Sequence, residues 1–266
     1  MASPVRCALT IAGSDSGGGA GIQADLKTFA ALGVFGTSAI TAVTAQNTIG
    51  VTAVHVLPAD AVTAQIEAVA ADIRIDATKI GMLASAAIVE AVAAAIAELD
   101  LPLVVVDPVM LAKSGDRLLD EDAVTAMTRE LLPRALVVTP NIPEAEVLSG
   151  MTIRSLDDAK RAAEKIHGRA GPAVVVKGGH GSGADVVDLL FDRGAFHEFR
   201  TRRMDTRNTH GTGCTFASAV AAHLALGQPL VDAVSLAQAY VVGAIRHGLS
   251  LGRGHGPLDH FWARPR

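Results

Sequence analysis

The sequence predicts an α/β fold of three layers, in which helices cover both faces of a mostly parallel sheet. Short apolar runs alternate with helical patterns along most of the chain. Half of the 266 residues are apolar and only 3% are aromatic, so we expect a core of Ala, Val, Ile and Leu. Because no linker or internal repeat interrupts this order, residues 1–266 are expected to form one domain.

The N-terminal half alternates between expected strands and helices. The apolar run Cys7–Ala12 predicts a strand, and a helix is expected from about Ala20 to Leu32, after a glycine-rich loop. Asp60 and Ser85 are each expected to cap a further helix. The apolar positions of these helices recur every three or four residues, at Val62, Ile66, Val69 and Ile73, and at Ile88, Val92, Ile96 and Leu99.

The C-terminal half repeats the pattern and then changes. Three continuous apolar runs predict strands buried on both faces: Leu103–Val106, Leu136–Val138 and Ala173–Val176. Ser155 is expected to open a helix that ends at Gly168. Two alternating segments around the turn Asp192-Arg193-Gly194 predict an antiparallel hairpin at an edge of the sheet, and two helices close the chain. These segments are Asp185–Phe191 and Phe196–Arg203, followed by the helices Gly213–Leu226 and Val231–His247.

Composition and charge narrow the functional classes. The formal net charge of −4 gives no reason to expect nucleic acid or an anionic membrane as partner. The two cysteines, Cys7 and Cys214, show neither a disulfide framework nor zinc-like spacing. The N-terminus lacks a signal-peptide pattern, and no apolar stretch approaches the roughly 18 residues of a spanning helix. We therefore expect a cytoplasmic protein.

Polar and glycine-rich segments follow the expected strands. In open α/β sheets, ligands bind outside the carboxyl ends of the strands, so these segments are expected to form one site. They are Gly13–Gly21, Gln46-Asn47, Gly81-Met82, Asp107-Pro108, Asn141–Glu144, Lys177–His180 and the turn before Cys214.

The segment Gly13–Gly21, here called the glycine loop, can bring backbone amides close to a ligand. No Lys-Ser/Thr pair follows it, so it is no Walker A loop, and it does not match the G-x-G-x-x-G dinucleotide spacing. The alternative is an ordinary tight turn. Ligand contact is the favoured interpretation, without a ligand identity.

The segment Asn208–Cys214, here called the cysteine turn, is expected to begin a helix. Unpaired amides at Gly211, Thr212 and Gly213 and the positive end of the helix dipole could hold a transferring phosphoryl group. The same field is expected to lower the pKa of the Cys214 thiol. The alternative, a buried small residue without reactivity, stays open on spacing alone.

Asn141 and Glu144 supply two oxygen ligands three residues apart, which suits a hydrated Mg²⁺. An ordinary helix cap with an acidic first turn is the alternative. Asp107 could add negative charge near the metal, and Lys177 could neutralise phosphate oxygens. Taken together, these groups are the parts that phosphoryl transfer needs.

The motifs in this order resemble the ribokinase-like superfamily, and most closely its hydroxymethylpyrimidine/phosphomethylpyrimidine kinases of thiamine biosynthesis. The resemblance covers nearly the whole chain. It is carried by Ala12–Ser16, Gly18–Asp25, Thr44–Thr48, Lys79–Met82, Asp107–Met110, Thr139–Glu144, Val176–His180, Asn208–Cys214 and Gly252–Pro257.

This resemblance implies ATP- and Mg²⁺-dependent phosphorylation of 4-amino-5-hydroxymethyl-2-methylpyrimidine, and then of its monophosphate to the diphosphate. It implies a ribokinase-like αβα fold, a homodimer and a monovalent cation such as K⁺ as a further cofactor. Cys214 stands where many sugar-kinase relatives carry Asp, so it is the expected base. The implied site residues are Gln46, Ala20, Met82, Val109, Gly13 and Asp25 for the pyrimidine, Cys214, Gly211, Thr212, Gly213 and Lys177 for catalysis, and Asp107, Asn141 and Glu144 for the metal.

Two other functions remain open. A pyridoxal kinase of the same superfamily shares the cysteine-type centre, and Met82 favours the pyrimidine because an apolar thioether suits a methyl-bearing ring. A non-catalytic metabolite-binding protein would not need the intact phosphate machinery. Dinucleotide binding is disfavoured because no acidic residue follows the glycine loop at the ribose-binding spacing.

Overall fold

The computed structural model describes residues 5–110, 121–180 and 183–263, so residues 1–4, on which the expectation for the N-terminus partly rests, lie outside it. The described strands form one sheet in the order β3-β2-β1-β4-β5-β6-β7-β8-β9. Their bounds are β1 Cys7–Asp15, β2 Phe35–Gln46, β3 Val51–Val56, β4 Ala77–Ile80, β5 Val104–Val106, β6 Val137–Val138, β7 Ala173–Val176, β8 Asp185–Asp192 and β9 Ala195–Arg202.

Strands β2, β1, β4, β5, β6 and β7 run parallel, and antiparallel strands flank this block on both sides. At one edge, β8 and β9 pair antiparallel, which confirms the expected hairpin. At the other edge, β3 pairs antiparallel with β2; a strand that ends before Gln46 was expected, but β3 was not. The sequence of β2 is rich in Ala and Thr, so it lacks the long apolar run that marks the central strands.

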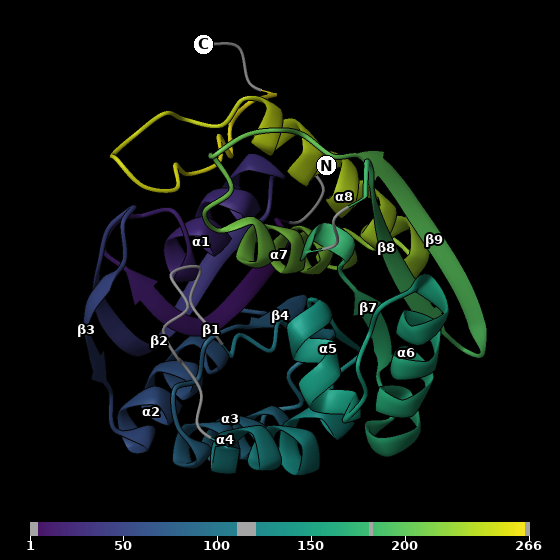
Figure 1. The fold of residues 1–266 in the computed structure, drawn as a ribbon. Helices are drawn as coiled ribbons and strands as arrows, with labels where there is room; N and C mark the ends of the chain where they lie inside the picture. The colour runs from purple at the N-terminus through teal and green to yellow at the C-terminus, as the bar shows by residue number, and fades with distance from the viewer. Residues whose placement is uncertain (1–4, 111–120, 181–182, 264–266) are drawn as a thin grey trace.

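Helices cover both faces of the sheet, which confirms the three-layer prediction (Figure 1). One layer contains α1 Gly21–Ala31, α7 Thr212–Ala225 and α8 Leu230–Arg246. The other contains α2 Ala59–Ala70, α3 Ala86–Glu98, α4 Glu121–Ala126, α5 Ile142–Ser149 and α6 Leu156–Ala170. The chain continues from α4 through a π-helical turn, Met127–Leu131, and a 3₁₀ turn, Leu132–Arg134; a second 3₁₀ turn is Gly178–His180.

Each face of the sheet buries its own apolar cluster. Along β1, Leu9 and Ile11 face the cluster under α2–α6, whereas Ala8 faces the cluster under α1, α7 and α8. This alternation follows from the two-residue period of a strand. The central strands read as continuous apolar runs because both of their faces are covered.

Two of the three expected helix caps are confirmed. The Ser85 and Ser155 side chains accept hydrogen bonds from the amides of Ile88 and Asp158. The expectation for Asp60 is wrong, because Pro58 occupies the cap position, α2 begins at Ala59, and Asp60 lies exposed inside its first turn. Helix α6 passes Gly168 and stops at Gly171, whose φ of +88° ends it.

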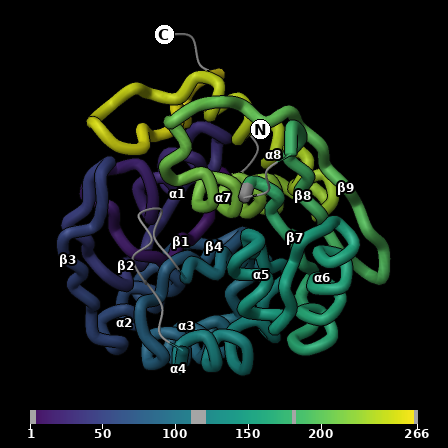
Figure 2. Tube along the Cα trace, viewed as in Figure 1, coloured from purple at the N-terminus to yellow at the C-terminus, as the bar shows by residue number. Residues whose placement is uncertain are grey.

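The segment after α8 returns to pack on the cysteine turn (Figure 2). The amide of His210 donates to the carbonyl of Gly256 (3.1 Å), and Asn208 Nδ2 donates to the carbonyl of Gly248 (3.1 Å). The amide of His255 reaches the carbonyl of Thr48 (2.9 Å), in the loop between β2 and β3. The C-terminal segment thus ties the turn before α7 to the loop after β2. None of the described helices combines the length and apolarity that crossing a membrane requires.

Candidate active site

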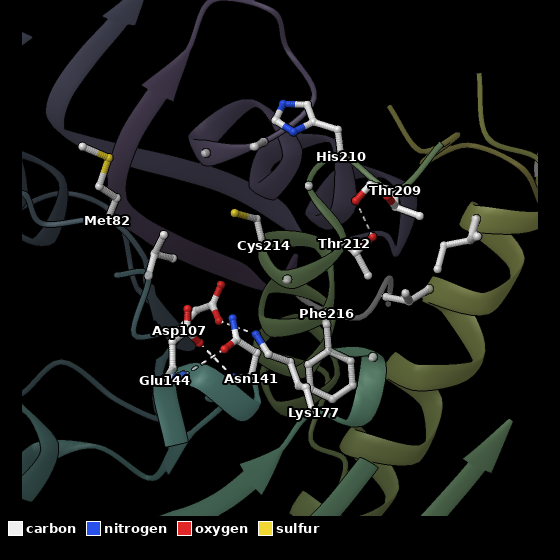
Figure 3. A pocket seen from close by; sticks show the side chains of 18 of the residues that line it. Met82, Asp107, Asn141, Glu144, Lys177, Thr209, His210, Thr212, Cys214 and Phe216 are labelled. Carbon is white, nitrogen blue, oxygen red and sulfur yellow. Dashed lines mark hydrogen bonds and ion pairs between the residues drawn. The ribbon is translucent and has the colours of Figure 1, made fainter. Parts of the chain in front are cut away.

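One cavity of about 840 Å³ lies at the carboxyl ends of the parallel strands. Figure 3 shows α7 with Cys214 at its start, facing the side chains that follow the central strands. The structure brings together here all but one of the site residues expected from the sequence. They are Gly13, Ala20, Gln46, Met82, Asp107, Val109, Asn141, Glu144, Lys177, Gly211, Thr212, Gly213 and Cys214.

The exception is Asp25, which does not line the cavity. Its side chain is fully buried and bonds to Lys79, Thr10 and Ser218. The expectation that Asp25 contacts the substrate is therefore wrong in this structure, because α1 turns the carboxylate into the interior.

The cysteine turn delivers the expected start of a helix. Gly211 precedes α7 with a φ of +81°, and no side chain caps the helix. Within the described part of the chain, the amides of Gly213 and Cys214 have no hydrogen-bond partner. Because both residues line the cavity, the positive end of the helix dipole faces it. This geometry suits a bound anion.

The expected lowering of the Cys214 pKa is wrong. Burial raises the pKa of this half-buried thiol to about 11, and the nearby carboxylates of Asp25 and Asp107 add to the rise. The positive charge of Lys79 acts to lower this pKa but does not outweigh the effect of burial. Desolvation and two negative charges outweigh the helix dipole, so the free thiol is neutral at pH 7.

Lys177 and Asp107 form an ion pair at the floor of the cavity, with 2.7 Å between Nζ and Oδ1 (Figure 3). Burial acts to lower the pKa of Lys177, but Asp107 and Glu144 together raise it, so its ammonium stays charged. A Cβ at Gly213 would lie 3.3 Å from Lys177 Nζ. The ammonium therefore lies beside the unpaired amides of α7.

Asn141 and Glu144 form a reciprocal capping box at the start of α5. The Glu144 amide donates to Asn141 Oδ1 (3.0 Å), and the Asn141 amide donates to Glu144 Oε2 (2.8 Å). Burial and the neighbouring Asp107 raise the pKa of Glu144 to about 7, despite Lys177. The helix-cap alternative is thus confirmed, and both side chains also line the cavity.

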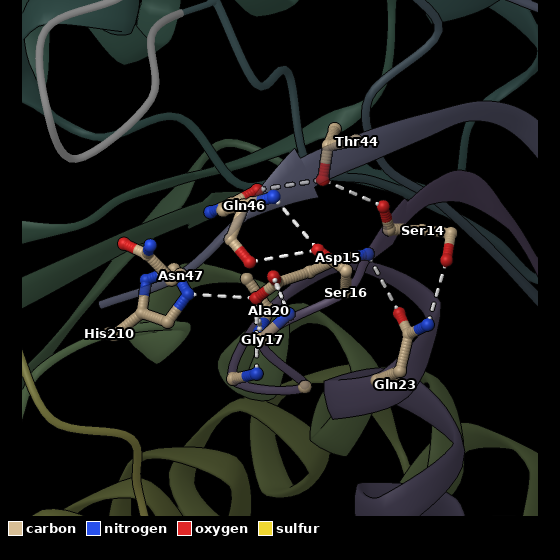
Figure 4. Close-up of polar contacts among 12 residues, drawn as sticks. Ser14, Asp15, Ser16, Gly17, Ala20, Gln23, Thr44, Gln46, Asn47 and His210 are labelled. Carbon is tan, nitrogen blue, oxygen red and sulfur yellow. Dashed lines mark hydrogen bonds and ion pairs between the residues drawn. The ribbon is translucent and has the colours of Figure 1, made fainter. Parts of the chain in front are cut away.

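Four successive amides of the glycine loop, Gly17–Ala20, are already bonded, contrary to the expectation that this loop offers them to a ligand. The Asp15 carboxylate accepts hydrogen bonds from the amides of Gly17 (2.7 Å), Gly19 (3.1 Å) and Ala20 (2.8 Å), as Figure 4 shows. The Gly18 amide is bound by the Asp15 carbonyl (2.9 Å). Sequence reasoning missed this role, although a carboxylate just before a run of glycines was the available signal.

Asp15 also binds the cysteine turn. Its Oδ2 atom lies 2.8 Å from Nε2 of His210, and both side chains are buried. Burial acts to raise the pKa of Asp15, but His210 and the loop amides prevail and lower it. The glycine loop and the turn before α7 are thus fastened by one carboxylate, which no sequence motif assigned.

Gln46 is held in place by two hydroxyl groups (Figure 4). Ser16 Oγ accepts a hydrogen bond from the backbone amide of Gln46 and donates one to its backbone carbonyl (2.8 Å each). Thr44 Oγ1 lies 3.1 Å from Oε1 of Gln46. The amide nitrogen of the side chain is left without a partner among the described residues, so it can donate to a ligand ring.

An apolar end of the cavity was also missed by the sequence analysis. It is lined by side chains of β8, of the segment after β9 and of α8, and these elements carried no motif. Its lining includes Val186, Met204, Val241, Val242 and Ile245. Such a surface can accommodate the planar base of a nucleotide.

Replacing Asp15 by Asn tests the fastening of the two loops. We expect Asp15→Asn to lower the free energy of unfolding at pH 7 by about 2 kcal/mol, because an amide cannot replace all four hydrogen bonds to the carboxylate. Since folding lowers the pKa of Asp15 below 3.8, its stabilisation is complete above that pH and disappears as the pH falls through the folded-state value.

Urea unfolding at pH 7 and thermal unfolding between pH 7 and pH 3 measure both effects. The difference from the wild type should shrink below about pH 4. Asp60→Asn makes the same chemical change at an exposed residue and is the matched control. Equal stability of Asp15→Asn and wild type at pH 7 would contradict the assigned role.

The chain has full-length relatives among characterised proteins. It is 52% identical over 255 residues to the hydroxymethylpyrimidine/phosphomethylpyrimidine kinase of Bacillus subtilis (strain 168), with 96% of this chain and 94% of that protein covered. It is 51% identical over 260 residues to the thiamine biosynthesis bifunctional protein ThiED of Geobacter sulfurreducens, covering 98% of this chain. The chain spans only about half of that longer relative, 53% of its length.

Solved structures show the same fold. The ADP complex of Bacillus subtilis pyridoxal kinase superposes with a TM-score of 0.92 at 39% identity, covering 99% of this chain and 100% of that one. The phosphomethylpyrimidine kinase of Clostridium difficile 630 has a TM-score of 0.80 at 45% identity, covering 90% of this chain and 99% of that one. A statistical model of the phosphomethylpyrimidine kinase family matches residues 15–259. The chain therefore belongs to the phosphomethylpyrimidine kinase family.

Proposed function

We propose that the chain transfers the terminal phosphoryl group of ATP to the hydroxymethyl group of 4-amino-5-hydroxymethyl-2-methylpyrimidine, and then to the resulting monophosphate, in thiamine biosynthesis. The observation that carries this proposal is a single cavity that holds unpaired α7 amides, the ammonium of Lys177 and the amide of Gln46. Phosphoryl transfer depends on positioned positive groups of this kind. The relatives named as kinases of this pathway support the substrate class.

Each residue has a defined part in this reaction. Gln46 donates to the pyrimidine ring, and Met82 packs beside Gly13, where a Cβ would come within 3.1 Å of its sulfur. The amides of Gly213 and Cys214, with Lys177, receive the negative charge of the phosphoryl group. The thiolate of Cys214, the minor form at pH 7, takes the proton of the hydroxymethyl group while the hydroxymethyl oxygen attacks the γ-phosphorus and ADP leaves.

Mg²⁺ fits the residues present, mainly through water. Asp107 and Glu144 supply carboxylate oxygens, and burial together with the charge of Asp107 raises the pKa of Glu144 to about 7, despite Lys177. The capping box already uses oxygens of Asn141 and Glu144, and no group of three or more His, Cys, Asp or Glu side chains forms a metal cluster among the described residues. Bound there, the ion would neutralise nucleotide phosphate oxygens.

The other properties implied by the family resemblance belong to the same proposal. They are a monovalent cation such as K⁺ as a further cofactor, a homodimer and a cytoplasmic location. We assign no residue to the monovalent cation or to the dimer interface.

Pyridoxal kinase is the second candidate function, because a pyridoxal kinase superposes with the TM-score of 0.92. Two proteins of one species allow a direct comparison. The chain is 52% identical to the pyrimidine kinase of Bacillus subtilis and 39% identical to the pyridoxal kinase of that species. The larger identity favours the pyrimidine.

A coupled assay of ADP release with three separate acceptors tests the substrate assignment. We expect turnover with the hydroxymethylpyrimidine and with its monophosphate, each with a kcat/KM at least about tenfold above that for pyridoxal, because Gln46 and Met82 fit the pyrimidine. A preference for pyridoxal would reverse the assignment. No ADP release with any acceptor would identify a non-catalytic binder.

Replacing Cys214 by Ala tests its role as base. We expect kcat to fall at least about 100-fold, because a positioned general base contributes that much, while the dissociation constant for the pyrimidine changes little. Isothermal titration and steady-state kinetics separate the two quantities. Cys7→Ala is the control, since Cys7 lies buried at the start of β1. An unchanged kcat in Cys214→Ala would remove the thiol from the mechanism.

A further inference from the structure

A fully buried ion pair lies next to the cavity, and the mechanism above does not use it. Lys79 on β4 and Asp25 on α1 are each 0% exposed, and 2.8 Å separates Lys79 Nζ from Asp25 Oδ2. Removing two charges from water is costly, so such a pair is weak evidence of stabilisation. Its position calls for another explanation.

The two partners differ in how completely they are satisfied. Asp25 Oδ2 also accepts from the hydroxyl of Thr10 (2.6 Å), and Oδ1 accepts from the hydroxyl of Ser218 (2.6 Å). The Lys79 ammonium has three N–H groups, and Asp25 is its one acceptor among the described residues. Two of the three N–H groups of Lys79 therefore have no acceptor among the described residues.

The pair lies under the face of α7 that carries Cys214. Cys214 and Ser218 are four residues apart on this helix, so they share one face. Ser218 contacts Asp25 directly, and Lys79 lines the same cavity as Cys214. Lys79 and Thr10 are partners in the pairing of β4 with β1, which places both beside Asp25.

Space for the ammonium is provided by a glycine. A Cβ at Gly81 would come within 2.8 Å of Lys79 Nζ, so a larger residue would displace the charge. Within the described part of the chain, the charged groups that act on Cys214 are Lys79 from β4, Asp25 from α1, Asp107 after β5 and Lys177 after β7. Lys177 is paired with Asp107 and also interacts electrostatically with Glu144. The partner of Lys79, Asp25, also accepts hydrogen bonds from two hydroxyls.

We propose that Lys79 is the buried counter-cation of Cys214, held in place by Asp25, Thr10 and Ser218. This inference rests on the proposed function, in which the Cys214 thiolate is the base. The substrate O–H proton moves to sulfur, the oxygen bonds to the γ-phosphorus, and the bond to the leaving ADP breaks with its electron pair. Lys79 stabilises the thiolate before this step without touching the substrate, so it is a positioning residue.

Alkylation of Cys214 by iodoacetamide measures the thiolate directly and needs no phosphoryl transfer. All variants carry Cys7→Ala, so that Cys214 is the one remaining thiol. We expect Lys79→Met to lower the alkylation rate between pH 7 and pH 9 by about tenfold or more, and to move the pH profile of kcat to higher pH. Thr215→Val, which removes a buried hydroxyl of α7 that bonds to His260 and leaves the Lys79–Asp25 pair intact, should change the alkylation rate by less than about threefold.

Lys79→Met leaves Asp25 buried without its partner and can fail to fold. The double variant Lys79→Met/Asp25→Asn removes both charges, and we expect it to be alkylated more slowly than the wild type as well. Alkylation that is unchanged or faster in a folded Lys79 variant overturns the inference, because a purely structural role would only loosen the site. If the Lys79 variants are alkylated more slowly than the wild type but the wild type shows no kinase activity, the role of Lys79 as counter-cation stands and the proposed function fails.

Discussion

The whole site depends on the close packing of the glycine loop against the cysteine turn. A Cβ at Gly211 would lie 1.8 Å from the carbonyl oxygen of Gly19, and a Cβ at Gly19 would lie 2.3 Å from the ring of His210. The buried Asp15–His210 pair holds the two segments at this distance. Because α7 begins directly after Gly211, this contact determines where the amides of Gly213 and Cys214 lie relative to Gln46 on the other wall of the cavity.

Anion binding in the proposed site relies on local groups, because the chain as a whole carries a formal net charge of −4. The two lysines that line the cavity among the described residues are each paired with a carboxylate, Lys177 with Asp107 and Lys79 with Asp25. Pairing keeps both ammonium groups protonated despite burial, which a lone buried lysine would not achieve. Burial raises the pKa values of Cys214 and Glu144, and the neighbouring carboxylates add to both rises. Because carboxylates surround the place proposed for the phosphates, a bound cation would favour phosphate binding in this site.

Much of this arrangement could be predicted from the sequence, because it follows from local patterns. The runs before Asp107, Thr139 and Lys177 predicted buried parallel strands, and the strand ends then predicted where polar residues meet. What failed depended on side-chain contacts that no periodicity encodes, some within one loop and some between distant segments. The free amides expected in the glycine loop are bound by Asp15, and Asp25 turns inward to Lys79. The pKa of Cys214 follows from burial and neighbouring charges, which no spacing reveals.

The central claim is that the start of α7 holds the transferring phosphoryl group. A crystal structure with a non-hydrolysable ATP analogue and the hydroxymethylpyrimidine would test it most directly. The account predicts that the terminal phosphate accepts hydrogen bonds from the amides of Gly213 and Cys214 and from Lys177, with the pyrimidine ring bonded to Gln46. A terminal phosphate bound elsewhere in the cavity, with these amides left facing water, would contradict it.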